Sequence, residues 1–132
     1  MPQHRRRVLC AESNADICHL ISTMLRQEGH EVVTAGTVAE SLARVRSGRF
    51  DLYVLDDYYP DGDGLDLCRE LRELTPGTPV LFFTTYEREA VTPPGAAHYL
   101  IKPEDIFEVV RTVNSILAPA REAAGHNGGR NA

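Results

Sequence analysis

Residues 50–65, FDLYVLDDYYPDGDGL, decide the fold of this chain. The segment opens with the short apolar run 52–55, which predicts a buried strand. Asp56 and Asp57 follow directly, and the proline, acids and glycines of 60–64 then predict a loop before a helix. In open α/β sheets, ligands bind at the carboxyl ends of the strands. We therefore interpret Asp56 as a nucleophile that accepts a phosphoryl group.

The alternation of a short apolar run with an amphipathic segment recurs on both sides of this stretch. The predicted strands are 8–11, 30–35, 52–55, 80–83 and 97–101, and the predicted helices are 14–28, 37–48, 64–74, one or two turns within 86–91, and 103–117. Such alternation predicts right-handed crossovers and a parallel sheet with helices on both faces. We expect an α/β fold with a five-stranded sheet in the order 2-1-3-4-5, which places the second strand at an edge.

The helix boundaries carry their own signals. Ser13 or Asn14 is predicted to cap the first helix, with Ser13 in the spacing of a capping box, and Gly29 is predicted to end it. Thr37 and Glu40 have the same capping-box spacing at the start of the second helix.

Length and charge limit the classes of protein. At 132 residues the chain predicts one domain, which we place at 1–118, followed by a disordered tail or linker at 119–132. The net charge of -5 argues against nucleic acid as a direct partner. The short basic run at 4–7 is interpreted as a solvated N-terminus.

The cysteines and histidines show no ligand spacing. Cys10, Cys18 and Cys68 form no Cys-x-x-Cys pair, which argues against a zinc site or a disulfide framework. Cys10 and Cys68 are predicted to be small buried residues of a cytoplasmic protein. No apolar stretch approaches about 18 residues, so no membrane insertion is expected.

Polar residues follow four of the predicted strands and should meet at one edge of the sheet. They are Glu12 and Ser13, Asp56 and Asp57, Thr84, and Lys102. Oxygen ligands of this kind suit Mg²⁺, which would neutralise an incoming phosphate. An aspartate can attack phosphorus to form an acyl phosphate. Lys102 would then pair with one phosphate oxygen, and Thr84 would donate a hydrogen bond to another.

This layout resembles the receiver domain of two-component response regulators over about residues 7–118. The resemblance depends on a set of residues in order along the chain: Asp56, Pro60, Asp63-Gly64-Leu65, Thr84, Tyr99 and Lys102-Pro103. It implies the flavodoxin-like receiver fold, with Asp56 as the phosphoacceptor. It further implies that Thr84 is the hydroxyl switch of the family, Tyr99 its aromatic switch and Lys102 the lysine of its phosphorylation site. The metal ligands implied are Glu12, Asp56 and the backbone carbonyl of Tyr58.

Two departures from the family pattern matter. The family usually has two adjacent acids after the first strand, and here Ser13 stands in the second place, which predicts weak Mg²⁺ binding. Glu12 or Asp57 is expected to compensate if the metal still binds. The segment between Thr84 and Lys102 is a few residues short, so we expect a shortened fourth helix and a reshaped face for partners.

Three hypotheses for the function follow. In the first, a sensor histidine kinase or phosphotransfer protein donates a phosphoryl group to Asp56, and the domain signals to a downstream protein target. In the second, the loss of an acid at Ser13 leaves a pseudo-receiver, a protein interaction module independent of phosphorylation. An aspartate-nucleophile phosphatase ranks lowest, because Tyr58 occupies the position of its general acid. We therefore expect no enzymatic turnover.

Overall fold

The central sheet has the predicted topology. The computed structural model describes residues 6–84, 98–101 and 105–118. Its strands are β1 (Arg7–Ala11), β2 (Glu31–Ala35), β3 (Leu52–Leu55), β6 (Val80–Thr84) and β7 (His98–Ile101). They form one sheet in the order β2-β1-β3-β6-β7, with all neighbours parallel. The predicted order is therefore confirmed, including β2 at an edge.

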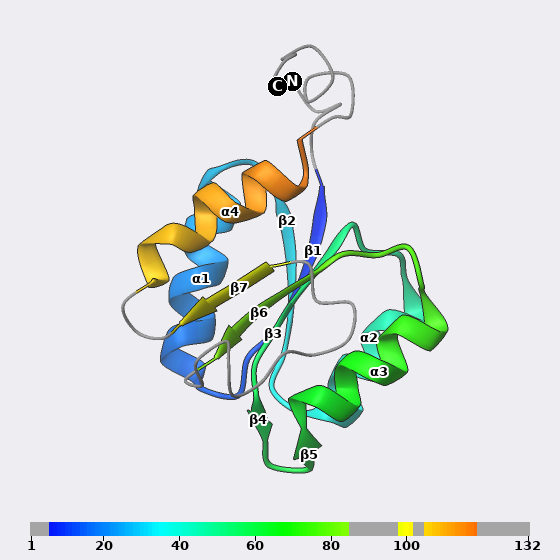
Figure 1. Cartoon of the computed structure of the whole chain (residues 1–132). Helices are drawn as coiled ribbons and strands as arrows, with labels where there is room; N and C mark the ends of the chain where they lie inside the picture. The colour runs from blue at the N-terminus through cyan, green and yellow to red at the C-terminus, as the bar shows by residue number, and fades with distance from the viewer. Residues whose placement is uncertain (1–5, 85–97, 102–104, 119–132) are drawn as a thin grey trace.

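Helices cover both faces of this sheet (Figure 1). They are α1 (Ala15–Gln27), α2 (Val38–Ser47), α3 (Gly64–Leu74) and α4 (Val109–Ile116), the last preceded by the 3-10 turn η2 (Ile106–Glu108). Alternate residues of the strands point to opposite faces, so each strand contributes to two cores. Leu9 and Tyr53 pack with α2 and α3, whereas Cys10 and Val54 pack with α1 and α4.

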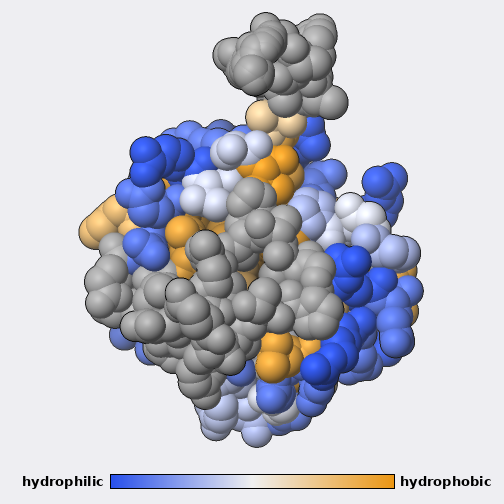
Figure 2. Space-filling view, viewed as in Figure 1, coloured by the Kyte–Doolittle hydropathy of each residue, from blue (hydrophilic) through white to orange (hydrophobic). Residues whose placement is uncertain are grey.

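The outward surfaces of the helices are polar. Figure 2 shows hydrophilic residues over the exposed sides of α2 and α3. On α3 these include the exposed residues Asp66, Arg69, Glu70 and Glu73, opposite the buried Leu67 and Leu71. This division is the amphipathic pattern that predicted the helix. Within residues 6–84, 98–101 and 105–118, no helix is long and apolar enough to cross a membrane.

Of the two residues predicted to cap α1, Ser13 or Asn14, the structure selects Asn14, whose side chain accepts a hydrogen bond from the backbone nitrogen of Ile17 at 3.0 Å. Two other local predictions need correction. Within the predicted loop after Asp57 lies a small antiparallel hairpin, β4 (Tyr58–Tyr59) and β5 (Gly62–Asp63). The last helix was predicted from Pro103, but its described part begins as the 3-10 turn and becomes α-helical at Val109.

Other helix ends agree with the sequence. Thr37 caps α2 by accepting from the nitrogen of Glu40 at 3.0 Å, and the Glu40 carboxylate reaches back to the nitrogen of Gly36 at 2.8 Å. Gly29 follows α1 with a φ of 92°, a left-handed conformation that favours glycine. The predicted short helix at 86–91 and the predicted tail at 119–132 lie outside the described residues.

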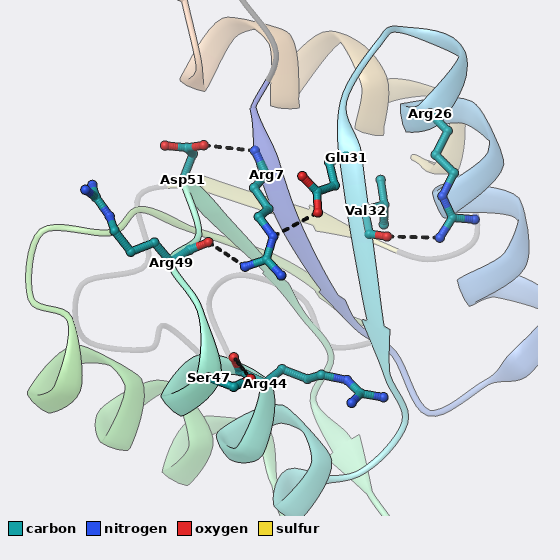
Figure 3. A network of polar contacts seen from close by, with 8 residues as sticks. All are labelled: Arg7, Arg26, Glu31, Val32, Arg44, Ser47, Arg49 and Asp51. Carbon is teal, nitrogen blue, oxygen red and sulfur yellow. Dashed lines mark hydrogen bonds and ion pairs between the residues drawn. The ribbon is translucent and has the colours of Figure 1, made fainter.

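Two arginines bind the outer edge of β2. Arg26 of α1 donates to the carbonyl of Val32 at 3.0 Å, a contact drawn in Figure 3, and Arg44 of α2 donates to the carbonyl of Thr34 at 3.3 Å. These carbonyls belong to an edge strand, whose outward groups have no neighbouring strand to bond. The guanidinium groups therefore replace the missing strand at these two positions.

A second network lies at the amino end of β1 (Figure 3). The Arg7 side chain pairs with Glu31 at 3.0 Å, donates to the carbonyl of Arg49 at 2.8 Å, and lies 4.5 Å from the centre of the Phe50 ring. Its backbone nitrogen donates to the Asp51 carboxylate at 2.8 Å. One side chain thus joins the starts of β1, β2 and β3.

Candidate functional site

The strand register brings the predicted acids to one edge of the sheet. Ala11 lies beside Leu55, and Leu55 lies beside Phe82. Because the three strands are parallel, Glu12 and Asp56 leave the sheet at the same level as adjacent residues. This edge includes the junction of β1 and β3, where the order of the strands reverses and doubly wound sheets bind their ligands.

Asp56 is buried at this edge, with 3% of its surface exposed. Its Oδ1 accepts a hydrogen bond from the backbone nitrogen of Asp57 at 2.7 Å, and its Oδ2 accepts one from the Ser13 hydroxyl at 3.2 Å. These donors fix the orientation of the carboxylate. Glu12-Ser13 and Asp56-Asp57 therefore meet as the sequence predicted, although they are more than forty residues apart, with Ser13 and Asp56 separated by 43 positions.

The phenol of Tyr59 bridges the ends of β1 and β3. Its hydroxyl donates to the carbonyl of Ala11 at 2.6 Å and accepts from the backbone nitrogen of Asp56 at 2.8 Å. The residue is 1% exposed, and burial raises the pKa of its hydroxyl well above the ordinary value. The phenol therefore stays protonated and holds the backbone of Asp56 next to β1.

Gly64 lets α3 begin directly against the backbone of the same aspartate. A Cβ atom at this position would lie 2.0 Å from the carbonyl oxygen of Asp56 and 2.9 Å from the Cα of Asp57. The Gly64 nitrogen donates to the Asp57 carbonyl at 3.0 Å. Asp63 caps the helix by accepting from the nitrogen of Leu65 at 2.6 Å. The three residues of the motif Asp63-Gly64-Leu65 therefore act together to start α3 against the backbone of Asp56.

Glu12 and Ser13 differ in how they face the site. Glu12 is 4% exposed, and its Oε2 accepts a hydrogen bond from the backbone nitrogen of Asn14 at 3.0 Å. Ser13 was predicted either as a helix cap or as a weak substitute for a metal-binding acid. Because Asn14 takes the cap, the Ser13 hydroxyl is directed to Asp56 instead.

The donor set suits a hard cation with few protein ligands. Glu12 and Asp56 supply carboxylates, and Ser13 supplies a hydroxyl at the same edge. Mg²⁺ prefers oxygen and keeps several of its waters, so two carboxylates with a backbone carbonyl are a reasonable set. In the described residues, no group of three or more His, Cys, Asp or Glu side chains is placed to hold a metal. A magnesium ion at this edge would therefore need the backbone carbonyl and water molecules besides the two acids.

The remaining predicted site residues are placed only in part. Tyr58 lies in β4 opposite Asp63, with an exposed side chain. Thr84 ends β6 beside Ile101, and Tyr99 lies in β7 beside Phe82, so both belong to strands that end at this edge. Lys102 lies outside the described residues. The predicted switch roles of Thr84 and Tyr99 and the predicted ion pair of Lys102 remain predictions.

Two residues of the site were missed by sequence reasoning. Tyr59 had no predicted role, and its only signal was an aromatic residue just before Pro60. Asp61, at the tip of the hairpin, accepts from the backbone nitrogens of Val38 at 2.8 Å and Ala39 at 3.0 Å. These two hydrogen bonds lower the pKa of the Asp61 carboxyl below its ordinary 3.8. The loop after the candidate nucleophile is therefore attached to the start of α2.

Comparisons with known proteins point to one family. The family model described as the response regulator receiver domain matches residues 8–114. The chain is 36% identical over 114 residues to the probable transcriptional regulatory protein TcrX of Mycobacterium tuberculosis. This match covers 83% of this chain and 49% of that protein. It is 30% identical over 127 residues to the response regulator ArlR of Staphylococcus epidermidis. This match covers 92% of this chain and 58% of that protein. The chain therefore spans only about half the length of these curated relatives.

Solved structures agree as well. The response regulator TrrA from Thermotoga maritima, solved in complex with Mg²⁺-BeF, superposes with a TM-score of 0.77 at 27% identity, covering 84% of this chain and 98% of that chain. A putative response regulator from Chloroflexus aurantiacus gives a TM-score of 0.79 at 29% identity, and the superposition covers 87% of this chain and 99% of that chain. By its family match, its fold and its relatives, this chain belongs to the response regulator receiver domain family of two-component signalling.

Proposed function

We propose that Asp56 accepts a phosphoryl group from a phosphohistidine on a sensor histidine kinase or a phosphotransfer protein. The observation that carries this proposal is the buried Asp56 carboxylate, oriented by the Asp57 nitrogen and the Ser13 hydroxyl at the carboxyl edge of a parallel sheet. Membership in the receiver family supports the same role. Orientation of this kind holds a nucleophile ready for attack and lowers the entropic cost of the reaction.

The proposed chemistry is a transfer between two side chains. A carboxylate oxygen of Asp56 attacks phosphorus, and the bond between phosphorus and the histidine nitrogen breaks. The imidazole leaves with the bonding electrons and takes up a proton. An acyl phosphate remains on Asp56, and its added charge is then stabilised by donors at the same edge. Thr84 and Lys102 are the proposed donors to the phosphoryl oxygens.

Magnesium fits this proposal with a reduced set of ligands. Glu12, Asp56 and the carbonyl of Tyr58 would hold the ion, and Ser13 would contribute no charge. When bound, Mg²⁺ neutralises the charge of phosphoryl oxygens and orients them. The solved complex of TrrA with Mg²⁺-BeF supports this expectation for a relative of the same fold. We expect the affinity to be weak, because an acid is missing at position 13.

The output is proposed to be protein binding. Phosphorylation would shift the population between two surface states through Thr84 and Tyr99, and a downstream protein would read the difference. We propose no enzymatic turnover, and the net charge of -5 makes nucleic acid an unfavourable direct partner for this chain.

The test is phosphorylation of the purified chain by a small phosphodonor such as acetyl phosphate with Mg²⁺. We expect the wild type and Asp66→Asn to gain one phosphoryl mass and Asp56→Asn to gain none. The Asp66 variant is the matched control, because it makes the same substitution at an exposed acid of α3 that has no proposed part in the site. A phosphoryl group that persists in Asp56→Asn, or none in the wild type at saturating donor, would defeat the proposal.

A pseudo-receiver is the second candidate, and the hydrogen bond from Ser13 to Asp56 favours it. The Ser13 hydroxyl donates a hydrogen bond to the Asp56 carboxylate but carries no negative charge that would attract a cation. The two candidates are separated by titration with Mg²⁺ or Mn²⁺ of the wild type and Ser13→Asp. Saturable binding by the wild type in the millimolar range or tighter supports the phosphoacceptor. Binding that appears only in Ser13→Asp supports the pseudo-receiver.

A further inference from the structure

The β4–β5 hairpin that follows Asp57 (Figure 1) is attached to the start of α2 by one side chain. Asp61 lies at the tip of this hairpin, between β4 and β5. Its Oδ1 accepts a hydrogen bond from the Val38 nitrogen at 2.8 Å, and its Oδ2 accepts one from the Ala39 nitrogen at 3.0 Å. Each carboxylate oxygen thus binds one of two successive amides, which fixes the orientation of the side chain. Bonds to an ionised acceptor are also stronger than neutral ones.

These bonds add to a helix start that already has its own cap. The Thr37 hydroxyl accepts from the Glu40 nitrogen at 3.0 Å, and the Ser41 nitrogen donates to the Thr37 carbonyl at 3.0 Å. The first amides of a helix have no partner inside it and are satisfied by local caps or by water. In α2 the first two of them are bonded by a residue more than twenty positions away. The contact therefore joins α2 to the hairpin, besides capping the helix.

The start of α2 is a fixed point for this attachment. The Glu40 carboxylate reaches back to the Gly36 nitrogen at 2.8 Å, directly after β2. Leu42 is buried in the core, and Val38 packs against the same core. A Cβ atom at Gly62 would lie 2.9 Å from the Cγ2 of Val38, so β5 runs directly against the first residue of α2. The hairpin tip is therefore held against a part of the fold that is itself anchored.

The other side of the hairpin reaches the candidate nucleophile. Tyr59 of β4 accepts from the Asp56 nitrogen at 2.8 Å, and Tyr58 before it carries the carbonyl proposed as a metal ligand. After β5, the Gly64 nitrogen donates to the Asp57 carbonyl at 3.0 Å. The strands β4 and β5 have only two residues each. So short a hairpin is marginally stable by itself, and its position depends on contacts with the rest of the fold.

We propose that Asp61 is a positioning residue for the phosphorylation of Asp56. Its carboxylate fastens the hairpin tip to α2 and thereby keeps the backbone of Tyr58 and Tyr59 in one place beside Asp56. The Tyr58 carbonyl is then held ready for a cation, and the carboxylate of Asp56 keeps its orientation. Small displacements of reacting groups are costly in rate, so a fixed hairpin favours the transfer. This inference rests on the proposed function of Asp56.

The test compares three variants of the full chain with the wild type. Asp61→Ala removes both acceptor oxygens. Asp61→Asn retains one of them, and asparagine is as good a helix cap as aspartate. Thr37→Ala is the matched control, because it removes a hydrogen bond from the same end of α2 and leaves the bonds from Asp61 to Val38 and Ala39 in place.

The first readout is amide hydrogen exchange measured by NMR, without Mg²⁺ or phosphodonor. Asp61→Ala should speed the exchange of the Asp56 and Gly64 amides by at least about threefold, because the hairpin that holds both opens more often. Thr37→Ala should speed the exchange of the Glu40 amide and leave the other two unchanged. Equal exchange of the Asp56 and Gly64 amides in the wild type and Asp61→Ala would overturn the proposal.

The second readout is labelling by acetyl phosphate over a series of Mg²⁺ concentrations. In Asp61→Ala, the Mg²⁺ concentration for half-maximal rate should rise by at least about threefold, because a displaced carbonyl holds the cation less well. Asp61→Asn should lie between this variant and the wild type. Thr37→Ala should label as the wild type does, although it unfolds at a lower urea concentration. A lower stability of Asp61→Ala with an unchanged Mg²⁺ dependence would show that Asp61 is merely structural.

The two readouts separate the positioning role from the proposed function. If the wild type takes no phosphoryl group, the proposed function of Asp56 fails, and the exchange rates still decide whether Asp61 holds the backbone beside it. If the wild type is labelled and Asp61→Ala keeps the same rate and the same Mg²⁺ dependence, the proposed function stands and the positioning role of Asp61 is excluded.

Discussion

The two ends of strands β1 and β3 hold charged side chains at different depths. At the amino end, the Arg7 guanidinium forms a partly exposed ion pair with Glu31, and the Arg7 backbone nitrogen donates to the Asp51 carboxylate (Figure 3). At the carboxyl end, Asp56 is buried, and its partners include a backbone nitrogen and the Ser13 hydroxyl. Partly exposed charges therefore join the strands at one end, whereas a buried acid lies at the other.

This contrast separates a structural network from a reactive one. Partly exposed ion pairs contribute modestly to stability and are screened by salt. A buried carboxylate at the carboxyl edge of a parallel sheet lies instead where ligands bind. If this distinction is correct, changes at the amino end should alter stability alone, whereas changes beside Asp56 at the carboxyl end should alter stability more and can also slow phosphorylation.

The largest effect is expected for Gly64→Ala at the carboxyl end. The new Cβ would lie 2.0 Å from the carbonyl oxygen of Asp56 and 2.9 Å from the Cα of Asp57. Both of these atoms belong to the backbone, so neither can rotate away as the end of a side chain could. We expect the free energy of unfolding to fall by about 3 kcal/mol, because α3 must shift away from β3. Urea unfolding monitored by circular dichroism measures the change.

Gly77→Ala is the control, because a Cβ atom there meets nothing within 4 Å. Its stability should remain within about 1 kcal/mol of the wild type. Equal unfolding midpoints for the two variants would show that the close contact of α3 with Asp56 is not required.

Tyr59→Phe should have the next largest effect. The variant leaves the Ala11 carbonyl and the Asp56 nitrogen without the hydroxyl that joins them. We expect a loss of about 2 kcal/mol, since both groups are buried, together with slower labelling by acetyl phosphate. Labelling kinetics at fixed Mg²⁺ and urea unfolding give the two readouts.

Tyr53→Phe is the control for Tyr59→Phe, because it removes the same hydroxyl group away from Asp56. It removes a hydroxyl whose partner, at 2.7 Å, is the Thr75 hydroxyl beyond the end of α3, and Thr75 keeps its bond to the Leu71 carbonyl. Its loss should be about 1 kcal/mol with an unchanged labelling rate. If the two phenylalanine variants label equally, Tyr59 has no positioning role for Asp56.

Arg7→Met should give the smallest effect and confine it to stability. The guanidinium contacts with Glu31 and the Arg49 carbonyl are lost, but an unbranched side chain can still cover Phe50. We expect a loss of about 1 kcal/mol at low salt, and less at about 1 M NaCl, with normal labelling. Arg69→Met, which removes an exposed pair with Asp66, should change nothing measurable. Slow labelling in Arg7→Met would erase the distinction between the two ends.

The sequence was sufficient for the sheet because the central strands β1, β3 and β6 carry uninterrupted apolar runs. In the run 52–55 all four residues are buried, so the first polar residue, Asp56, had to appear at the strand end. The alternation with helices then restricted the topology to a doubly wound sheet, and the glycine at 29 marked a helix end through its backbone freedom.

The contacts that orient the site could not be predicted, since they join residues distant in sequence. Tyr59 meets Ala11 across 48 positions, and Asp61 meets Val38 across 23. Ser13 had two possible uses, and its choice depended on the neighbouring Asn14 taking the cap. Local patterns identified the candidate residues, but tertiary packing decided what each side chain bonds.

The two arginines on β2 have a consequence for self-association. Because Arg26 and Arg44 already bind the carbonyls of Val32 and Thr34, an incoming strand would have to displace two guanidinium groups before it could extend the sheet. Growth of a continuous intermolecular sheet from this side is thereby opposed. Copies of this protein that associate at the β2 edge should do so through helices or loops, and fibrillar aggregation from this edge should require loss of these arginines.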